Sequence, residues 1–388
     1  MFTFIIFLLV LSLVVLVHEF GHFFVARLSG MKVFEFGWGF PPRAIGFYRD
    51  PLTKKIVWVW KSRANDLAET VGGVPREQQF PATLYSINWL PLGGFVKIKG
   101  ENGDTEDEDS FSAKKFGPKL ATLLAGVVMN FILAAILLGV GFMIGLPTDL
   151  SNLGDERAII VKSAEVMIQH VEKDSPAAIA GLKTGDVIRT VNGTAVQNTS
   201  VLINLFRESE KKVLNLEIKR DELIFNQAVT PVYIEKDGVP RLGVGLADAG
   251  VIRFPWYLAF YKGFVAAGMG FLNVFVAFYI LVRELILGNG LAFGVSGPVG
   301  IAVAVGESAR LGFSYLLNVT AMISLSLAAL NVLPIPALDG GRALFVIIEK
   351  LFRRKIPIKV EQITHTVGFV ALLFLIVVIT WRDISALF

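Results

Sequence analysis

The sequence predicts an α-helical polytopic membrane protein of about four transmembrane helices, with a small α/β domain inserted between them. Hydrophobic residues make up 54% of its 388 residues and charged residues only 18%, against averages of about 45–50% and about 25% in soluble domains. Several apolar runs also reach the roughly 20 residues that a helix needs to cross a bilayer. The chain has no cysteine, which excludes disulfide scaffolds and thiolate metal sites.

The long apolar runs define the predicted spans. Four of them are expected to be transmembrane helices, at residues 1–28, 120–146, 313–341 and 364–382. The first run lacks a basic N-terminal region and a small-residue cleavage site, and it holds the ionisable residues His18, Glu19 and His22. A secretory signal has no use for buried ionisable groups, so this run is predicted to remain as a membrane helix.

The distribution of charge predicts the orientation of the chain. Residues 27–119 carry 14 basic against 11 acidic side chains and residues 342–359 carry six against one, whereas residues 146–253 carry 13 against 15. Because positively charged loops stay in the cytoplasm, the loop 29–119 is predicted to be cytoplasmic and the inserted domain extracytoplasmic. The small net charge of +4 therefore reflects membrane orientation, and no nucleic-acid partner is expected.

Residues 158–247 are predicted to form the inserted α/β domain. Short β-branched runs at 159–162, 187–191 and 213–219 alternate with turn signals such as Asn192-Gly193, a pattern typical of strands joined by tight turns. One helical stretch, 200–209, lies among these runs. A segment of this length is sufficient for a small domain that folds outside the bilayer.

The pentapeptide His18-Glu19-Phe20-Gly21-His22 carries the clearest chemical signal. Its pattern, H-E-x-x-H, places two imidazoles one turn apart on the same face of a helix, where both can bind one metal ion. Zn²⁺ suits imidazole ligands and lowers the pKa of a bound water to about 7. Glu19 is placed to act as general base and then as proton donor to a leaving amine. Ionisable groups inside a membrane span indicate a functional site.

A third metal ligand must come from another part of the chain, because a catalytic zinc site has three protein ligands and one open position. The candidates in or near other apolar segments are Asp339, His365, Asp383, Glu284 and Glu307. Asp339 directly follows an apolar span, in the segment NVLPIPALDGG at 331–341. The prolines of this segment end the helix and its paired glycines let the backbone approach closely, which would aim a carboxylate into a packed interior.

These motifs resemble a known family. H-E-F-G-H in the first span and N-x-x-P-x-P-x-L-D-G-G in a late span are similar to the site-2 protease family of intramembrane zinc metalloproteases. The segments PLGGFVK at 91–97 and SGPVGIA at 296–302 resemble its bacterial branch, which includes the regulator of sigma-E protease. Residues 171–196, with SPA, AGL and GDVI, resemble a single PDZ domain. One departure is AGVVMN at 125–130, where relatives usually have Ala-Gly-Pro before an asparagine.

The resemblance implies roles for individual residues. The implied zinc ligands are His18, His22 and Asp339, and the implied catalytic base is Glu19. The 29–119 loop would contain a membrane-associated β region that pairs with the substrate. The residues implied to bind the substrate backbone are Asn331, Gly94, Phe95, Val96 and Lys97.

The depth of the two metal motifs constrains residues 256–287, a fifth apolar stretch. The first span runs inward and carries its histidines in the inner half, so the span that precedes Asp339 must also run inward. If residues 256–287 crossed the bilayer completely, Asp339 would emerge on the outer side, too far from the histidines to share a metal ion. This stretch is therefore predicted to be an amphipathic helix on the outer surface or a re-entrant helix.

The predicted function is zinc-dependent cleavage of the transmembrane segments of single-span proteins in a bacterial cell (inner) membrane. Release of an anti-sigma factor and clearance of remnant signal peptides are the reactions that the resemblance implies. The PDZ-like domain would dock substrate tails by strand addition or act as a size filter. The alternative is a membrane transporter or a proton or ion pathway that uses buried His, Glu and Asp. Such a protein would be expected to show internal repeats, and the sequence has none.

Overall fold

The computed structural model describes the chain except for residues 1, 61–69, 72–73, 76–79, 102–104, 106, 151–154, 156, 173–174, 209–211, 221–222, 235–238, 289–295 and 386–388. The described residues form two compact units. One unit combines Met1–Gly139 with Tyr261–Phe388, and the other comprises Val140–Phe260. The predicted fold class, a helical membrane protein with an inserted α/β domain, is confirmed.

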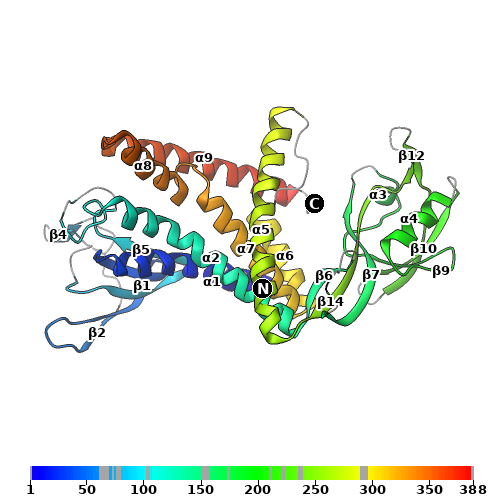
Figure 1. The fold of residues 1–388 in the computed structure, drawn as a ribbon, viewed down its shortest axis with the longest axis horizontal. Helices are drawn as coiled ribbons and strands as arrows, with labels where there is room; N and C mark the ends of the chain where they lie inside the picture. Colours follow the sequence, from blue (N-terminus) through cyan, green and yellow to red (C-terminus); the bar gives the residue numbers. More distant parts are fainter. Residues whose placement is uncertain are drawn as a thin grey trace. The chain divides into compact units, whose positions relative to one another are not determined.

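Long apolar helices dominate the first unit (Figure 1). Five helices are long and apolar enough to cross a membrane: α1 (Phe2–Leu28), α2 (Phe116–Ile144), α5 (Trp256–Ile286), α7 (Phe313–Val332) and α9 (Ile358–Ser385). Two helices of 14 residues each, α6 (Pro298–Leu311) and α8 (Asp339–Phe352), flank α7 in the sequence. Their length is below the roughly 20 residues that a membrane-spanning helix needs.

Helix α5 is the segment whose membrane placement the sequence left open. It is one continuous helix of 31 residues. In its most apolar stretch of 18 residues, only 6% of the residues are buried. In Figure 1 the yellow α5 runs across the direction of α1, α2 and α9 instead of beside them. Its length would allow it to cross a bilayer, so the prediction of a surface helix stays a prediction.

A three-stranded antiparallel sheet lies in the loop between α1 and α2. Its strands are β1 (Val33–Arg49), β2 (Ile56–Trp60) and β5 (Leu84–Ile98), in the order β2-β1-β5. Two further short strands in this loop, β3 (Thr70–Val71) and β4 (Val74–Pro75), pair with each other.

Strands β1 and β5 each pair along two separate stretches. Residues 35–38 of β1 pair with 84–87 of β5 on one side and with 94–97 on the other. The stretch 94–98 therefore forms one edge of the sheet, and among the described strands only β1 pairs with it.

The β5 residues at this edge of the sheet pack closely against α1. A Cβ atom on Gly93 would lie 2.7 Å from Cγ1 of Val15, and one on Gly94 would lie 3.4 Å from Cδ1 of Leu16. A small apolar core then joins the sheet to three helices. Its buried residues are Ala26, Met31, Val33, Ile98, Phe111, Leu123 and Ala343. This core holds α1, α2, the sheet and α8 around one point, where the functional side chains lie.

The second unit contains the inserted α/β domain. Its sheet has the order β11-β10-β8-β7-β14-β6, with β9 paired to β8. The strands of this unit are β6 (Leu146–Asp149), β7 (Ile159–Val171), β8 (Val187–Val191), β9 (Thr194–Ala195), β10 (Leu214–Arg220), β11 (Leu223–Val229), β12 (Val232–Ile234), β13 (Val239–Arg241) and β14 (Val244–Arg253). Its helices are α3 (Pro176–Ile179) and α4 (Thr199–Glu208).

The core of the inserted domain lies between its sheet and its helices. The side chains of Ile168, Ile188, Leu202, Leu216 and Ile218 are each at most 1% exposed within it. The sheet also extends beyond the predicted range 158–247, because β6 pairs with the last residues of β14. The segments that enter and leave the predicted domain, 146–149 and 249–252, therefore pair with each other in the same sheet.

Candidate metal centre

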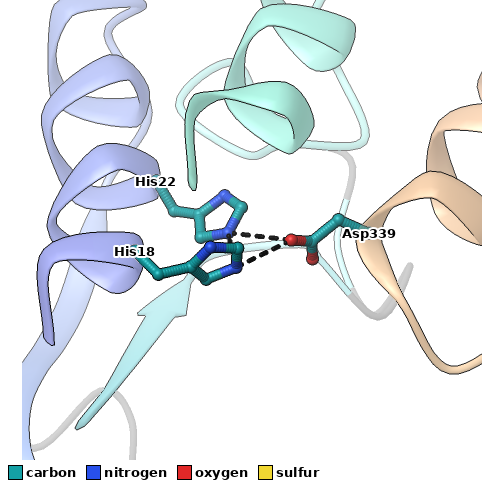
Figure 2. Close-up of side chains that lie close together, drawn as sticks. All are labelled: His18, His22 and Asp339. Atoms are coloured by element: carbon teal, nitrogen blue, oxygen red, sulfur yellow. Dashed lines mark hydrogen bonds and ion pairs between the residues drawn. The ribbon is translucent and has the colours of Figure 1, made fainter. Parts of the chain in front are cut away.

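Three side chains from two distant parts of the sequence meet at one point (Figure 2). Nε2 of His18 lies 2.9 Å from Oδ2 of Asp339, and Nε2 of His22 lies 3.3 Å from the same oxygen. The two Nε2 atoms are 3.2 Å apart. Both histidines are buried. Among the described residues, this is the group of His, Asp and Glu side chains whose ligand atoms gather closely enough to hold a metal ion.

The distances between these atoms fit a tetrahedral zinc site. Zinc binds imidazole nitrogen and carboxylate oxygen at about 2.0–2.2 Å, so two ligand atoms at tetrahedral corners lie about 3.3–3.5 Å apart. The observed separations of 2.9, 3.2 and 3.3 Å are close to this spacing. Two imidazoles and one carboxylate are also ligands that zinc prefers, and three protein ligands leave one position open.

The two histidines lie in a narrow space between α1 and α2. A Cβ atom on Gly126 would lie 2.6 Å from Cε1 of His18 and 2.6 Å from Nε2 of His22. A Cβ atom on Gly21 would overlap the backbone carbonyl of Ala125. Glycine at these two positions therefore lets the helices pack closely enough for α2 to cover the imidazoles.

Helix α2 also orients the imidazole of His22. Nδ1 of His22 lies 2.8 Å from the backbone carbonyl oxygen of Thr122. A carbonyl oxygen only accepts, so Nδ1 must carry the proton and donate it. Nε2 is then left with a free lone pair directed at Asp339, which is the tautomer that a metal ligand needs.

Asn130 on α2 lies beside the other imidazole. Its side-chain Nδ2 is 3.5 Å from Nδ1 of His18, and its buried Oδ1 has no hydrogen-bond partner among the described residues. Because amide nitrogen and oxygen are assigned from their hydrogen bonds, a half-turn of this amide would place Oδ1 next to Nδ1 of His18. Oδ1 of Asn130 would then accept from Nδ1–H of His18, and both imidazoles would have the same tautomer.

Asp339 reaches the histidines because the chain turns sharply after α7. The helix ends at Val332, and Asp339 is the first residue of α8. A Cβ atom on Gly340 would overlap the carbonyl oxygen of Leu333, and one on Gly341 would overlap that of Ile335. The paired glycines predicted to allow a close backbone approach therefore do so, and the turn directs the carboxylate toward α1.

Glu19 lies beside the cluster, in the wall of a cavity of about 220 Å³. The same cavity is lined by His22, Asp339, Phe95 and Val96, together with five further residues. The carboxylate of Glu19 is thus next to the cluster, and it is not one of the three side chains whose ligand atoms converge. This is the arrangement expected of a general base, which must contact a metal-bound water without ligating the metal.

The residues predicted to bind the substrate backbone lie in two places. Phe95 and Val96 of β5 line the cavity, while Gly94 and Lys97 pair with Trp38 and Glu35 of β1 in the same stretch of sheet. Asn331 is buried near the C-terminal end of α7.

The other candidate ligands lie elsewhere. Oδ2 of Asp383 accepts hydrogen bonds from the backbone N–H groups of Gly297 and Gly300, each at 2.8 Å, at the start of α6. Glu284 pairs with Arg283 on α5. Nδ1 of His365 accepts a hydrogen bond from the backbone. None of these three residues, nor Glu307 on α6, belongs to the described cluster.

Comparisons with known proteins agree with this geometry. The model of peptidase family M50 matches residues 6–56 and 74–375, and so includes all three clustered side chains. The chain belongs to peptidase family M50. It is a zinc metalloprotease, and its apolar helices make it a multi-pass membrane protein.

Relatives match this M50 protease over nearly its full length. A Clostridium perfringens protein that carries the name of a zinc metalloprotease is 31% identical over 379 residues, which is 97% of each chain. The regulator of sigma-W protease RasP of Bacillus subtilis is 26% identical over 441 residues, covering 100% of this chain and 99% of RasP. Among solved structures, a PDZ domain of an SdrC-like protein from Listeria monocytogenes is 24% identical, covers 23% of this chain and 95% of its own, and has a TM-score of 0.21.

Sequence reasoning missed Thr122 and Gly126, and it noted the segment of Asn130 only as a departure from the family pattern. Thr122 contributes a backbone carbonyl, which leaves no signal in residue type. Gly126 and Asn130 lie in the AGVVMN segment, and its small residue followed four positions later by a polar one, inside an apolar span, was the available signal. Four positions correspond to about one helical turn, so both residues face the histidines.

Proposed function

We propose that this M50 protease is an intramembrane zinc metalloendopeptidase that cleaves transmembrane segments of single-span membrane proteins. His18, His22 and Asp339 would hold the zinc ion, and Glu19 would be the catalytic base. The observation that carries the proposal is the triangle of two Nε2 atoms and one carboxylate oxygen with sides of 2.9–3.3 Å. Its two histidines lie on a helix long and apolar enough to span a bilayer.

Zinc, when bound, supplies a Lewis acid that activates water and polarises the scissile carbonyl. The residues of the chain perform the remaining steps. Glu19 takes a proton from the attacking water and passes it to the nitrogen of the leaving amine as the peptide bond breaks. Thr122 and Asn130 keep the imidazoles of His22 and His18 in the orientation that presents Nε2, and the packed walls of the cavity limit the access of bulk water.

The substrate is proposed to bind as an added strand. A transmembrane helix shields its carbonyls in internal hydrogen bonds, so it must unwind locally before cleavage. The sheet stretch 94–98 pairs with β1 and with no other described strand, and Phe95 and Val96 face the cavity that contains Glu19. An extended segment pairing there would exchange helical hydrogen bonds for strand hydrogen bonds next to the metal centre. Asn331 would help to hold its backbone.

The orientation and the role of the inserted domain complete the proposal. The bacterial relatives support a location in a bacterial cell membrane, and charge bias supports a PDZ-like domain on its outer side. There the domain would dock substrate tails or exclude substrates that have not been trimmed. Helix α5 would lie on the outer surface, because a continuous helix contains no turn at which the chain could dip into the bilayer and return.

The class of substrate is proposed from the relatives. One of them is by name a regulator of sigma-W protease, which supports release of a membrane-held anti-sigma factor. Clearance of remnant signal peptides is the second reaction that this site would suit. The transporter alternative gains no support, because the chain belongs to a peptidase family.

The decisive experiment compares the wild-type enzyme with Glu19→Gln in bacterial membranes. The variant keeps the three ligand atoms, so it should retain about one zinc per chain while cleavage stops. Quantitative proteomics of the membranes should then show short single-span fragments that accumulate only with the variant. If Glu19→Gln retained cleavage, or if no single-span protein accumulated, the proposed function would be wrong.

A further inference from the structure

The last helix, α9, contacts the turn that carries Asp339. Nδ1 of His365 lies 2.8 Å from the backbone nitrogen of Ala337, two residues before Asp339. A backbone N–H only donates, so Nδ1 must be the acceptor and the proton of the neutral ring must lie on Nε2. This hydrogen bond joins residues 28 positions apart in the sequence.

The turn needs this support because its backbone is strained. Ala337 has a φ of +77°, in the left-handed region that an alanine rarely adopts. Such a conformation persists only where the surrounding structure holds it. Among the described residues, the imidazole of His365 is the hydrogen-bond acceptor for the N–H of Ala337.

A second contact on the same face of α9 fixes the distance between the helix and the turn. A Cβ atom on Gly368 would lie 2.5 Å from Cβ of Pro336 and 2.7 Å from its carbonyl oxygen. His365 and Gly368 are three positions apart and so lie on one face of the helix. On the other side, the ring of His365 packs against the ring of Phe345 from α8, with their centroids 5.6 Å apart. The imidazole therefore lies between the turn and the helix that Asp339 begins.

We propose that His365 is a positioning residue for the metal centre, which holds the 333–338 turn so that the Asp339 carboxylate reaches the two histidines. The inference rests on the proposed function, because it assigns to the last helix a task in building the same zinc site. Packing of α9 into a hydrophobic core does not explain the contact, since no residue of α9 is buried. The helix touches the turn through this one face.

The test measures metal binding, not activity. Full-length protein in lipid nanodiscs is loaded with Co²⁺, whose visible spectrum reports tetrahedral coordination, and its affinity is measured by competition with a chelator. In His365→Phe the ring is kept and the acceptor is lost, so metal affinity should fall about tenfold or more, as for other outer partners of metal ligands. In His365→Asn the side-chain oxygen can replace Nδ1, so affinity should stay near that of the wild type. The matched control is Thr366→Val, because within the described part of the chain that hydroxyl bonds only to the carbonyl of Gln362 in its own helix.

Each outcome decides the inference. Wild-type affinity and spectrum in His365→Phe would overturn it, and so would an equal loss in His365→Phe and His365→Asn. If His365→Phe does not fold, His365→Gln replaces it, because the longer side chain cannot place its acceptor at the Nδ1 position, and the same loss is expected. A wild-type protein that binds metal and cleaves no substrate would instead refute the proposed function. The comparison of affinities would remain valid in that case.

Discussion

Nε2 of His18 lies 2.9 Å from Oδ2 of Asp339, although 321 positions separate the two residues in the sequence. A partly buried carboxylate beside two buried imidazoles is costly unless it is paired or binds a metal. Three helices and a sheet are packed around the pair. The relationship therefore indicates that much of the first unit is organised to bring one carboxylate to one helix.

Removal of this carboxylate should remove the metal. We expect Asp339→Ala to lower zinc affinity by more than about a hundredfold, because even outer partners of a ligand contribute 10–100-fold, and cleavage should be lost with it. The control is Asp383→Asn, which alters the carboxylate at the start of α6 and should leave zinc content unchanged. Zinc per chain is measured by atomic emission. Full zinc occupancy in Asp339→Ala would contradict the proposed ligand set.

A single methyl group on α2 should displace the histidines. In Gly126→Ala the new Cβ would lie 2.6 Å from ring atoms of both His18 and His22, closer than real atoms approach, so the rings or the helices must move. We expect metal affinity to fall about tenfold or more. Gly117→Ala on the same helix is the matched control, because a Cβ there meets no described neighbour within 4 Å. Equal metal affinity in the two variants would show that the packing around the histidines has more room than the structure gives it.

Proline substitutions can test whether a substrate strand adds to β5. Successive N–H groups along a strand point to opposite edges of that strand. One of the two variants Val96→Pro and Lys97→Pro therefore removes an N–H that donates to β1. The other removes an N–H from the outer edge, where a substrate strand would pair. The outer-edge variant should fold normally and bind zinc, yet lose most cleavage of a transmembrane substrate. Thermal unfolding identifies which variant is which. Unchanged cleavage in the variant that folds normally would rule out strand addition at this edge.

Excision of the inserted domain can separate docking from filtering. Asp149 of β6 pairs with Ala249 of β14 in antiparallel register, so an Asn-Gly turn can join these two residues and replace 150–248 while keeping a hairpin. If the domain excludes untrimmed substrates, the shortened enzyme should cleave a substrate with an intact outer domain. If the domain docks substrate tails, cleavage of every substrate should fall. Cleavage that matches the wild type for trimmed and untrimmed substrates alike would exclude both roles.

The membrane placement of α5 can be tested by labelling, because the natural chain has no cysteine. Single cysteines are placed at Tyr257, in the first turn of the helix, and at Gly288, just beyond its end. Both should react with an impermeant maleimide added from outside. A cysteine at Leu52, which is 92% exposed in the loop predicted to be cytoplasmic, should react only after the cells are opened. Labelling of Tyr257 and Gly288 from opposite faces would show that α5 crosses the bilayer, and the proposed orientation would need revision.

Much of the fold and of the site could be predicted from local sequence. The apolar runs predicted α1, α2, α7 and α9, although the span predicted at 313–341 ends as a helix at Val332 and is followed by a turn and the start of α8. The spacing of His18 and His22 placed both imidazoles on one helix face. The prolines and glycines around Asp339 predicted a turn that allows close backbone approach. The sequence predicted the inserted domain as well, although not the pairing of β6 with β14, which joins residues about a hundred positions apart.

By itself, the sequence determined which segments become helices and which of their faces carry chemistry, because both follow from a periodicity set by neighbouring residues. Only the tertiary structure decided which of five candidate ligands completes the cluster. It also placed Thr122 and Asn130 beside the histidines and His365 against the turn before Asp339. These contacts join side-chain and backbone groups from different helices and the turn before α8. Their distances depend on how closely glycine lets the helices pack, which no single stretch of sequence specifies.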